Sequence, residues 1–385
     1  MYLLKLIARN AMRHKLRTIL TVLGLMVATI SFGFLQTVVN AWYAGAEGAA
    51  ATTLVTRNAT SLVFPLPLSY EARIRAVNGV TGVARANWFG GIYQDPKNFF
   101  AQFAISAETY LDIYRDYLLP EADRTAFLRD RKGVIVGRKL ADQYGFKVGD
   151  VIPIKGTIYP GTWEFVLRGI YDGAKTTTNT ATMFFHWDYI NESIKRQAPR
   201  RGNQVGVFVI GIRQPEDAAV ISNAIDAQFR NSLAETLTET EKAFQLGFVS
   251  MSEAIVVAIR VVSFVVIVII MAVMANTMAM SALERLSEYA TLKVLGFGPG
   301  FLTILIFGES LLLAMVGCLL GVGLLFPLAS GFARLMGTMF PVFEVSLWTV
   351  LQQIMAALAV GAVAAIAPTL RATRVNIVEG LRSIG

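Results

Sequence analysis

Long stretches of apolar residues with few or no charges recur along the chain. They cover residues 18–39, 254–280, 301–329 and 345–367. Arg260 and Glu309 are the charged residues inside the second and third stretches, and Gln352 and Gln353 lie near the start of the fourth. A helix needs about 20 apolar residues to cross the hydrocarbon core of a bilayer. The pattern therefore predicts four transmembrane helices.

The first apolar stretch could instead belong to a secretory signal peptide. The apolar part of such a peptide spans only about 7–15 residues and is followed by a cleavage site of small residues. Residues 46–51 resemble a cleavage site weakly, and the apolar stretch is longer than a signal peptide needs. The lead before it carries the basic residues Lys5, Arg9, Arg13, Lys15 and Arg17. We therefore interpret this stretch as an uncleaved anchor.

Basic residues beside the predicted spans indicate their orientation, because Lys and Arg accumulate on the cytoplasmic side. The N-terminal lead contains no acidic residue, and only Glu379 opposes Arg371, Arg374 and Arg382 after the last span. Both termini are therefore predicted to be cytoplasmic, as an even number of spans requires. The long segment between the first and second spans must then lie outside the cytoplasm.

These predictions give one organisation for the whole chain. In order, it is a cytoplasmic amphipathic segment 1–17, a first span 18–40, a periplasmic α+β domain with a stalk 41–253, a second span 254–280, a cytoplasmic loop 281–300, a third span 301–329, a short periplasmic loop 330–344, a fourth span 345–367 and a cytoplasmic tail 368–385.

The segment 41–253 has scattered charges, short apolar groups, and many Pro and Gly residues that mark turns. Its short apolar or alternating stretches predict strands at residues 133–136, 151–154, 163–170 and 205–212. Apolar residues at helical spacing predict helices at 138–146 and 217–228. Residues 232–252 contain no helix breaker, so we predict a helix that continues into the second span as a stalk.

Composition excludes several classes of protein. Hydrophobic residues make up 54% of the 385 residues, charged residues only 16%, and there is one cysteine. No intrachain disulfide can form, and His14 and His186 are too few for a zinc-type cluster. The net charge of +8 arises largely beside the apolar stretches, where it sets membrane orientation rather than nucleic-acid binding. No nucleophile, histidine and carboxylate form a triad-like set, so we expect no catalytic site.

Five segments resemble the mechanotransmitting ABC transporter permeases of the MacB/FtsX/LolC type, and together they extend over nearly the whole chain. The opening, residues 7–18 (IARNAMRHKLRT), is similar to the N-terminal signature of the family. Residues 133–141 (GVIVGRKLA) with 144–150 (YGFKVGD), and then 165–171 (FVLRGIY), resemble motifs of its periplasmic domain. Residues 284–296 (ERLSEYATLKVLG) resemble its inner loop. The tail, residues 367–372 (APTLRA) and 376–382 (NIVEGLR), departs at Ile377 and Gly380, where the family usually has Pro and Ala.

This resemblance implies a function in transport. Such permeases dimerise and pair with a separate cytoplasmic ATPase, whose closure moves the outer domains. The sequence contains no Gly-x-x-x-x-Gly-Lys-Ser/Thr loop, so ATP and Mg²⁺ are expected on the partner ATPase, with no cofactor bound by this chain. The expected localisation is the inner (cytoplasmic) membrane.

The loop 281–300 is the segment expected to contact the ATPase. Its helical periodicity ends at Gly296, and a short amphipathic helix can dock into a groove on a partner. The alternative is a helix that only lies on the lipid surface. The residues assigned to ATPase coupling are Glu284, Arg285, Glu288, Leu292, Lys293 and Gly296.

Two further features of the third span suggest roles. Glu309 is an intramembrane ionisable residue, which is costly and therefore a functional candidate. At its shallow depth we favour a hydrogen bond to a neighbouring helix over proton or substrate handling. Gly317, Gly321 and Gly323 would allow close helix packing, within one subunit in preference to a dimer seam.

The outer target cannot be read from these residues. Export with an outer partner, lipoprotein or lipid handling, and control of a cell-envelope enzyme all fit the resemblance. The expected partners are the ATPase, a second permease in a homodimer or heterodimer, a periplasmic adaptor or other envelope protein, and membrane lipid. The alternative function is a membrane-anchored sensor or scaffold, against which the short cytoplasmic segments argue.

Overall fold

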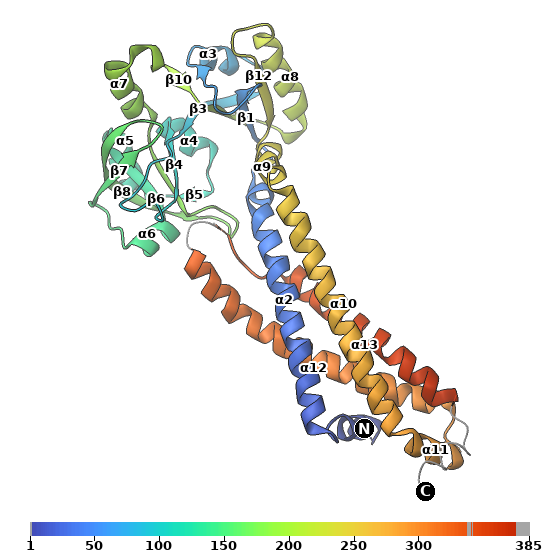
Figure 1. The fold of residues 1–385 in the computed structure, drawn as a ribbon. Coiled ribbons are helices and arrows are strands. Elements are labelled where there is room, and N and C mark those ends of the chain that lie inside the picture. The colour runs from blue at the N-terminus through green and yellow to red at the C-terminus, as the bar shows by residue number, and fades with distance from the viewer. Residues whose placement is uncertain (1, 337–339, 341, 375–385) are drawn as a thin grey trace. The chain divides into compact units, whose positions relative to one another are not determined.

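The computed structural model describes residues 2–336, 340 and 342–374. Internal contacts divide the chain into two units. The helical unit comprises Met1–Asn40, Glu253–Arg334 and Phe343–Gly385, and the sheet unit comprises Ala41–Ser252 and Leu335–Val342. The sheet unit is thus inserted between the first and second long helices of the helical unit (Figure 1).

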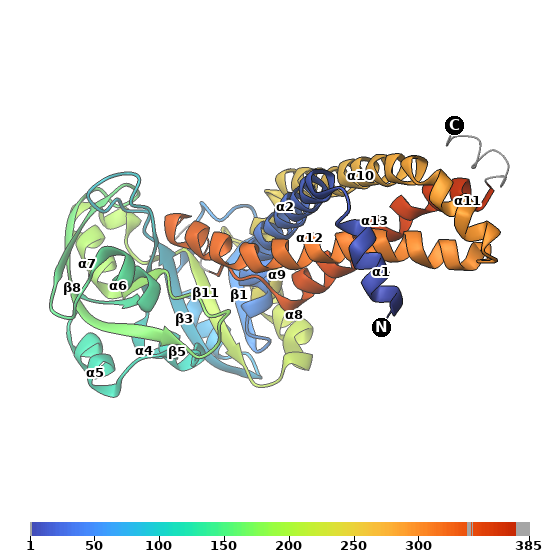
Figure 2. The same ribbon diagram turned by 90° about the horizontal axis from the view of Figure 1, so that it is seen from below.

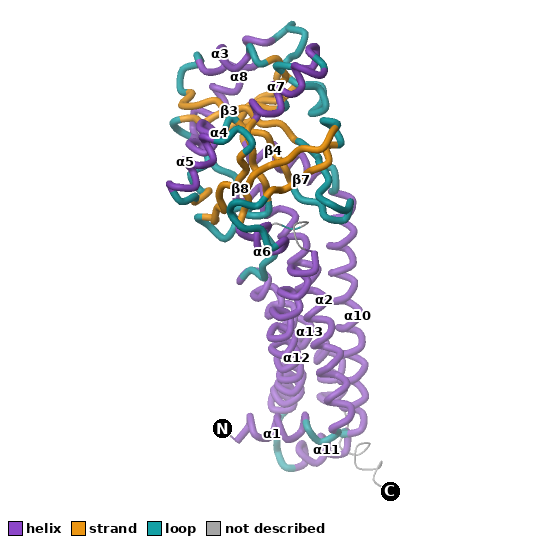
Figure 3. Tube along the Cα trace, turned by 90° about the vertical axis from the view of Figure 1, so that its left-hand side faces the viewer, coloured by secondary structure: helices purple, strands orange, loops and turns teal. Residues whose placement is uncertain are grey.

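Four helices of the described chain are long and apolar enough to cross a membrane. They are α2 (Lys15–Gly48), α10 (Glu253–Glu284), α12 (Pro299–Met336) and α13 (Leu347–Arg374). Each is longer than the predicted span, because polar residues continue the helix past the ends of the apolar stretch. The long helices gather into one bundle, as Figure 3 shows. This arrangement confirms the predicted fold class of four membrane helices with an α+β domain between the first two.

Two short helices complete the helical unit. Helix α1 (Tyr2–Ala11) packs on α12, where Ile7 lies against Gly308 (Figure 2). Helix α11 (Leu286–Val294) follows α10 after the single non-helical residue Arg285. Polar side chains also join the long helices, as expected where apolar side chains face lipid. The Gln353 amide donates to the carbonyl of Thr29 at 2.8 Å, and Ser310 donates to the carbonyl of Gly361 at 2.6 Å.

The sheet unit is built on a mixed sheet of ten strands within the described residues. The strand order is β12-β1-β11-β3-β4-β9-β6-β8-β5, with β7 paired to β8; β4–β9 and β6–β8 are parallel, and the other pairs are antiparallel. The strands are β1 (Thr53–Asn58), β3 (Val80–Trp88), β4 (Ala101–Ile105), β5 (Tyr117–Leu118), β6 (Gly133–Gly137), β7 (Val151–Gly156), β8 (Gly161–Gly173), β9 (Thr182–His186), β11 (Val207–Ile212) and β12 (Thr236–Thr240), while β2 (Leu66–Pro67) and β10 (Gln204–Val205) form a separate pair.

Side-chain alternation divides the core of this unit between the two faces of the sheet. Val134 and Val136 join one buried cluster with Phe185, whereas Ile135 joins a second cluster with Phe184. Successive residues of a strand point to opposite faces, so the two clusters lie on opposite sides. Helices cover both faces: α3 (Tyr70–Arg75), α4 (Ala107–Ile113), α5 (Glu121–Arg129), α6 (Arg138–Tyr144), α7 (Trp187–Gln197), α8 (Ala218–Phe229) and α9 (Glu241–Ser250).

Most predicted elements of this unit are present. The strands predicted at 133–136, 151–154 and 163–170 lie within β6, β7 and β8, and the predicted helices correspond to α6 and α8. The strand predicted at 205–212 is divided at Gly206 between β10 and β11.

The stalk helix predicted at residues 232–252 is right only for Glu241–Ser250, and it does not continue unbroken into the second span. Residues Thr236–Thr240 form the edge strand β12, which pairs with β1, and α9 begins only at Glu241. The Asp226 carboxylate accepts hydrogen bonds from the Thr236 and Thr238 hydroxyls, at 2.8 and 2.7 Å, and these contacts hold the strand. The Thr240 hydroxyl then caps α9 by accepting from the amide of Ala243, and Met251 and Ser252 separate α9 from α10.

Candidate functional site

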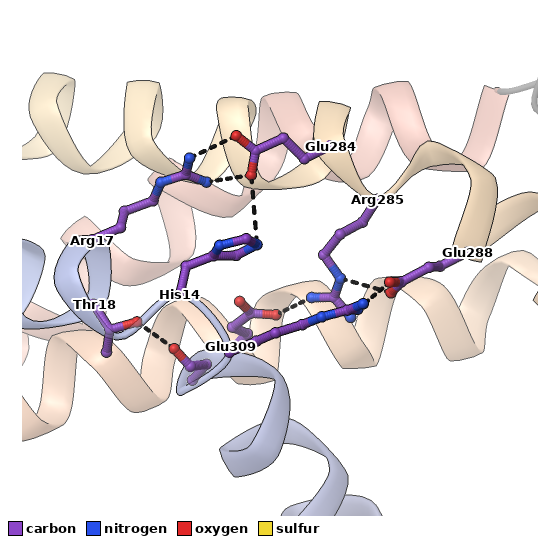
Figure 4. Close-up of polar contacts among 9 residues, drawn as sticks. His14, Arg17, Thr18, Glu284, Arg285, Glu288 and Glu309 are labelled. Carbon is purple, nitrogen blue, oxygen red and sulfur yellow. Dashed lines mark hydrogen bonds and ion pairs between the residues drawn. The ribbon is translucent and has the colours of Figure 1, made fainter. Parts of the chain in front are cut away.

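Seven charged or titratable side chains meet where α1 joins α2, α10 joins α11, and α12 passes beside them. We call this group the ion-pair cluster; its members are Arg13, His14, Arg17, Glu284, Arg285, Glu288 and Glu309. All belong to the helical unit, although the first three lie more than two hundred residues from the others in the sequence. Figure 4 shows how they converge.

The centre of the cluster is the buried ion pair between Arg285 and Glu309. Arg285 Nη1 donates to Glu309 Oε2 at 2.8 Å, and each residue is only 5% exposed. Arg285 can turn inward because its backbone leaves the helix there, at φ −108° and ψ 15°. Its guanidinium also lies 5.4 Å from the ring of Tyr289, a cation–π contact. The pair therefore fixes the start of α11 against α12.

Two further links tie α10 and α11 to the N-terminal segment. Arg17 donates to both carboxylate oxygens of Glu284, at 2.7 and 2.6 Å, in the bidentate geometry that makes such pairs strong. Arg13 donates to Glu288, which also accepts from Arg285 Nε at 3.2 Å. Partial burial alone would raise the pKa of Glu288, but these two guanidinium groups more than offset it and hold that pKa below its ordinary value.

Burial has a clearer effect on Tyr289, the aromatic neighbour of Arg285. Burial raises the pKa of Tyr289 to about 12, despite the opposing charge of the guanidinium. Its hydroxyl is therefore harder to ionise than that of a solvent-exposed tyrosine, and the ring acts as an apolar wall beside the ion pair.

The remaining predicted coupling residues lie along α11. Lys293 donates to the carbonyl of Thr373 in the last turn of α13 at 2.9 Å, and Leu292 packs against the core of the helical unit. Gly296 ends the segment at φ +90°, a left-handed conformation that favours glycine after a helix. Helix α11 is thus held at both ends, by Arg285 at its start and Lys293 at its end.

Sequence reasoning missed the apolar residues that α11 leaves uncovered among the described residues. Val294 is 58% exposed, Leu295 69% and Phe297 41%. By contrast, several predicted coupling residues have their charges turned towards other helices of the same chain. We call Val294, Leu295 and Phe297 the apolar tip. In the sequence they follow the charged residues that were assigned to ATPase coupling.

The three glycines of α12 differ in their surroundings. A Cβ atom at Gly317 would lie 2.5 Å from Leu25 Cβ, and one at Gly321 would lie 2.7 Å from Thr29 Cβ, so α12 approaches α2 closely at both. A Cβ at Gly323 would meet no described atom within 4 Å. The predicted packing role of Gly323 within the subunit is therefore wrong, because residue 323 is on a different face of the helix from 317 and 321.

No metal site accompanies the cluster. Within the described part of the chain, no group of three or more His, Cys, Asp or Glu side chains is placed to hold a metal. His186, which the sequence left without an assigned role, is buried in the sheet unit with Nε2 2.8 Å from the carbonyl oxygen of Phe127. Burial lowers its pKa. The tail residues after 374, including Glu379 and Arg382, lie outside the described residues.

Comparison with known families gives two matches that follow the division of the chain. The profile of the MacB-like periplasmic core domain matches residues 18–228, which is more than half of the chain. The profile of the FtsX-like permease C-terminal part matches residues 260–377. The first covers α2 and most of the sheet unit, and the second covers the helices that follow.

Individual relatives are distant. An uncharacterized ABC transporter permease of Methanocaldococcus jannaschii is 24% identical over 402 residues, covering 97% of this chain and 96% of the relative. Among solved structures, the periplasmic region of MacB from Actinobacillus actinomycetemcomitans is similar at 10% identity and a TM-score of 0.37, covering 52% of this chain and 94% of that one. The extracellular domain of the ABC-type transporter YknZ from Gram-positive bacteria is similar at 11% identity and a TM-score of 0.35, covering 49% and 100%.

Proposed function

The chain belongs to the ABC transporter permeases that combine a MacB-like periplasmic core domain with an FtsX-like permease C-terminal part, and from this membership we propose a mechanical function for it. The helical unit converts closure of a separate cytoplasmic ABC ATPase into movement of the sheet unit outside the membrane. The served process is export, lipoprotein or lipid handling, or control of an envelope enzyme.

The ion-pair cluster is the observation that carries this proposal. It joins the N-terminal segment, α10, α11 and α12 through charged contacts on one side of the bundle. A displacement of α11 would therefore also move α2, α10 and α12, because each of these helices contains, or is bonded to, a residue that flanks α11. Glu284, Arg285, Glu288 and Lys293 act in this account as positioning residues that hold the coupling helix.

The apolar tip provides the surface for the ATPase itself. Val294 is the last residue of α11, Leu295 and Phe297 follow it in the chain, and all three expose apolar surface. Apolar anchors that enter a pocket on a partner typically dominate the affinity of a protein interface. Leu292, which the sequence assigned to this contact, packs inward and supports the tip instead.

The remaining features follow from the same assignment. Both termini and α11 lie in the cytoplasm, and the sheet unit lies beyond the inner (cytoplasmic) membrane. ATP and Mg²⁺ are bound by the ATPase, and this chain binds no cofactor. Two permease chains, identical or related, assemble with the ATPase, and an adaptor or another envelope protein meets the sheet unit.

Leu295→Asp tests the contact with the ATPase. We expect the variant to lose co-purification with the ABC ATPase by about tenfold or more, because a charge replaces an apolar anchor at the interface. The tagged chain is purified from its own membranes in mild detergent, and the ATPase is identified by its own nucleotide-binding loop and quantified per permease.

Leu233→Asp is the matched control, since Leu233 is a leucine of the sheet unit that is even more exposed than Leu295, at 110% against 69%. It should co-purify with the ATPase at the level of the unchanged chain. Normal ATPase recovery with Leu295→Asp would contradict the assignment of the apolar tip. Failure of the unchanged chain to recover any ABC ATPase would contradict the proposed function as a whole.

A further inference from the structure

The sheet unit contains a cavity of about 690 Å³ that neither the family match nor the proposed coupling explains. Its walls come from the loop before β2, strands β3 and β4, and helices α7 and α9. Figure 1 labels β3, β4, α7 and α9. The volume lies within the range of roughly 300–1,000 Å³ typical of small-molecule sites. Apolar side chains dominate the lining, among them Val63, Trp88, Phe103, Ile190 and Phe248.

Two amide side chains in the wall, those of Asn87 and Asn191, are already engaged with the protein. The Asn87 side chain accepts from Trp187 Nε1 and Gly206 N, at 2.9 and 3.0 Å, and donates to the Tyr159 hydroxyl at 3.1 Å. The Asn191 side chain is bonded to Asn203 through both its oxygen and its nitrogen. These amides therefore have little capacity left for a ligand, and the cavity presents a mainly hydrocarbon surface.

Arg201 is the charged residue among those that line the cavity, and no carboxylate accompanies it there. It lies in a short 3₁₀ turn, Pro199–Arg201, and is solvent-exposed. No described hydrogen bond or ion pair occupies its guanidinium. The cavity thus combines an apolar interior with a cationic group at its edge, which is complementary to an amphiphile with an anionic head.

We propose that this cavity binds a single-chain anionic amphiphile, with its acyl chain among Trp88, Ile190 and Phe248 and its carboxylate or phosphate at Arg201. Large apolar side chains exposed at the mouth support this assignment. Val63 is 85% exposed, Trp88 39% and Phe248 46%, and all three line the same cavity. Exposed apolar side chains that gather in one patch, unlike scattered ones, mark binding sites.

An anionic amphiphile would be a ligand of the sheet unit within the proposed function, and its biological meaning rests on that function. Helix α9 contributes Phe244, Gln245 and Phe248 to the lining, and only Met251 and Ser252 separate α9 from the second long helix α10. A bound acyl chain therefore contacts the segment that leads directly into a membrane helix. Binding itself requires no ATPase and can be measured without one.

Photocrosslinking with a diazirine-bearing palmitate tests the site. The full chain is placed in phosphatidylcholine nanodiscs without the ATPase, irradiated, and digested for mass spectrometry. We expect labelled peptides that contain Trp88 or Phe248, and we expect unlabelled palmitate to compete while hexadecylamine does not.

Two variants with matched controls make the test specific. Val63→Asp places a charge at the apolar mouth and should reduce labelling by about tenfold, since an entering acyl chain must displace water from the carboxylate, whose charge also repels an anionic head. Its control is Val220→Asp, an exposed valine of α8 outside the cavity. Arg201→Glu should reduce labelling by about tenfold through loss of the charge-assisted contact, whereas the neighbouring exposed Arg200→Glu should not.

Labelling confined to the membrane helices would overturn the inference, as would equal labelling of Val63→Asp and Val220→Asp. Competition by hexadecylamine as strong as that by palmitate would overturn the anionic class. These outcomes are separable from failure of the proposed function. A chain that recovers no ATPase can still show the expected labelling, and one with normal ATPase recovery can lack it.

Discussion

Replacing Glu309 by leucine should lower the free energy of unfolding of the helical unit by about 3–5 kcal/mol, the cost typical of breaking a buried ion pair from one side. The substitution leaves the Arg285 guanidinium in place with its 2.8 Å partner removed. Glu288, which is partly exposed and shared with Arg13, cannot replace that partner fully. Unfolding in mixed micelles of increasing denaturing-detergent content, followed by circular dichroism, measures the loss.

A double substitution separates the pair from general disruption of the core. Arg285→Leu combined with Glu309→Leu should be markedly more stable than Glu309→Leu alone, because no unpaired charge then remains buried. The control is Arg138→Leu, which breaks the exposed pair with Asp172 and should cost about 1 kcal/mol or less. If Glu309→Leu unfolds like the unchanged chain, the pair does not hold α11 against α12.

Valine at Gly317 or Gly321 should cost about 1–3 kcal/mol at each position, the usual range for overpacking. Close approach of α12 to α2 leaves no room for a side chain at either site. The backbone carbonyl of Met26 lies 2.9 Å from the Cβ position of Gly321, and that of Val22 lies 3.2 Å from the Cβ position of Gly317. The helices must separate, and the packing around Leu25 is lost with them. The same micelle titration measures the effect.

Gly323→Val is the matched control in the same helix. No described atom lies within 4 Å of a Cβ at residue 323, so this variant should unfold as the unchanged chain does. Equal destabilisation by all three valines would mean that glycine content, rather than contact with α2, sets the stability of α12. Stability of Gly317→Val and Gly321→Val equal to that of the unchanged chain would contradict the close approach itself.

The broad architecture could be predicted from the sequence because its signals are local. One long apolar stretch predicts each of the four long helices. In β7 and β8, buried and more exposed residues alternate, as they do in half-buried strands. The stalk prediction failed because β12 is a short edge strand of five residues. Its stability depends on Asp226 and Thr56, and neither contact is visible in the local pattern.

The ion-pair cluster was only half predictable. Glu309, Arg285, Glu284 and Glu288 each stood out as charges in or beside apolar segments, but their partners depend on how the helices pack. Arg17 and Glu284 are 267 positions apart, and Arg13 and Glu288 are 275 apart. No periodicity within one helix can link residues so distant. For the same reason the sequence assigned Glu284, Arg285 and Glu288 to a partner protein and overlooked the apolar tip, although it did assign Glu309 to a bond with a neighbouring helix.

The proposed function requires that α11 and the sheet unit lie on opposite sides of one membrane, so that the ATPase can move the sheet unit by moving α11. Single cysteines at two exposed positions, Val148→Cys and Leu295→Cys, test it in a chain that also carries Cys318→Ala. In cells that lack the partner ATPase, so that position 295 is uncovered, a maleimide that cannot cross the cytoplasmic membrane should label position 148 while the cells are intact and position 295 only after that membrane is breached. Labelling of position 295 in intact cells, or of position 148 only after breaching, would contradict the account.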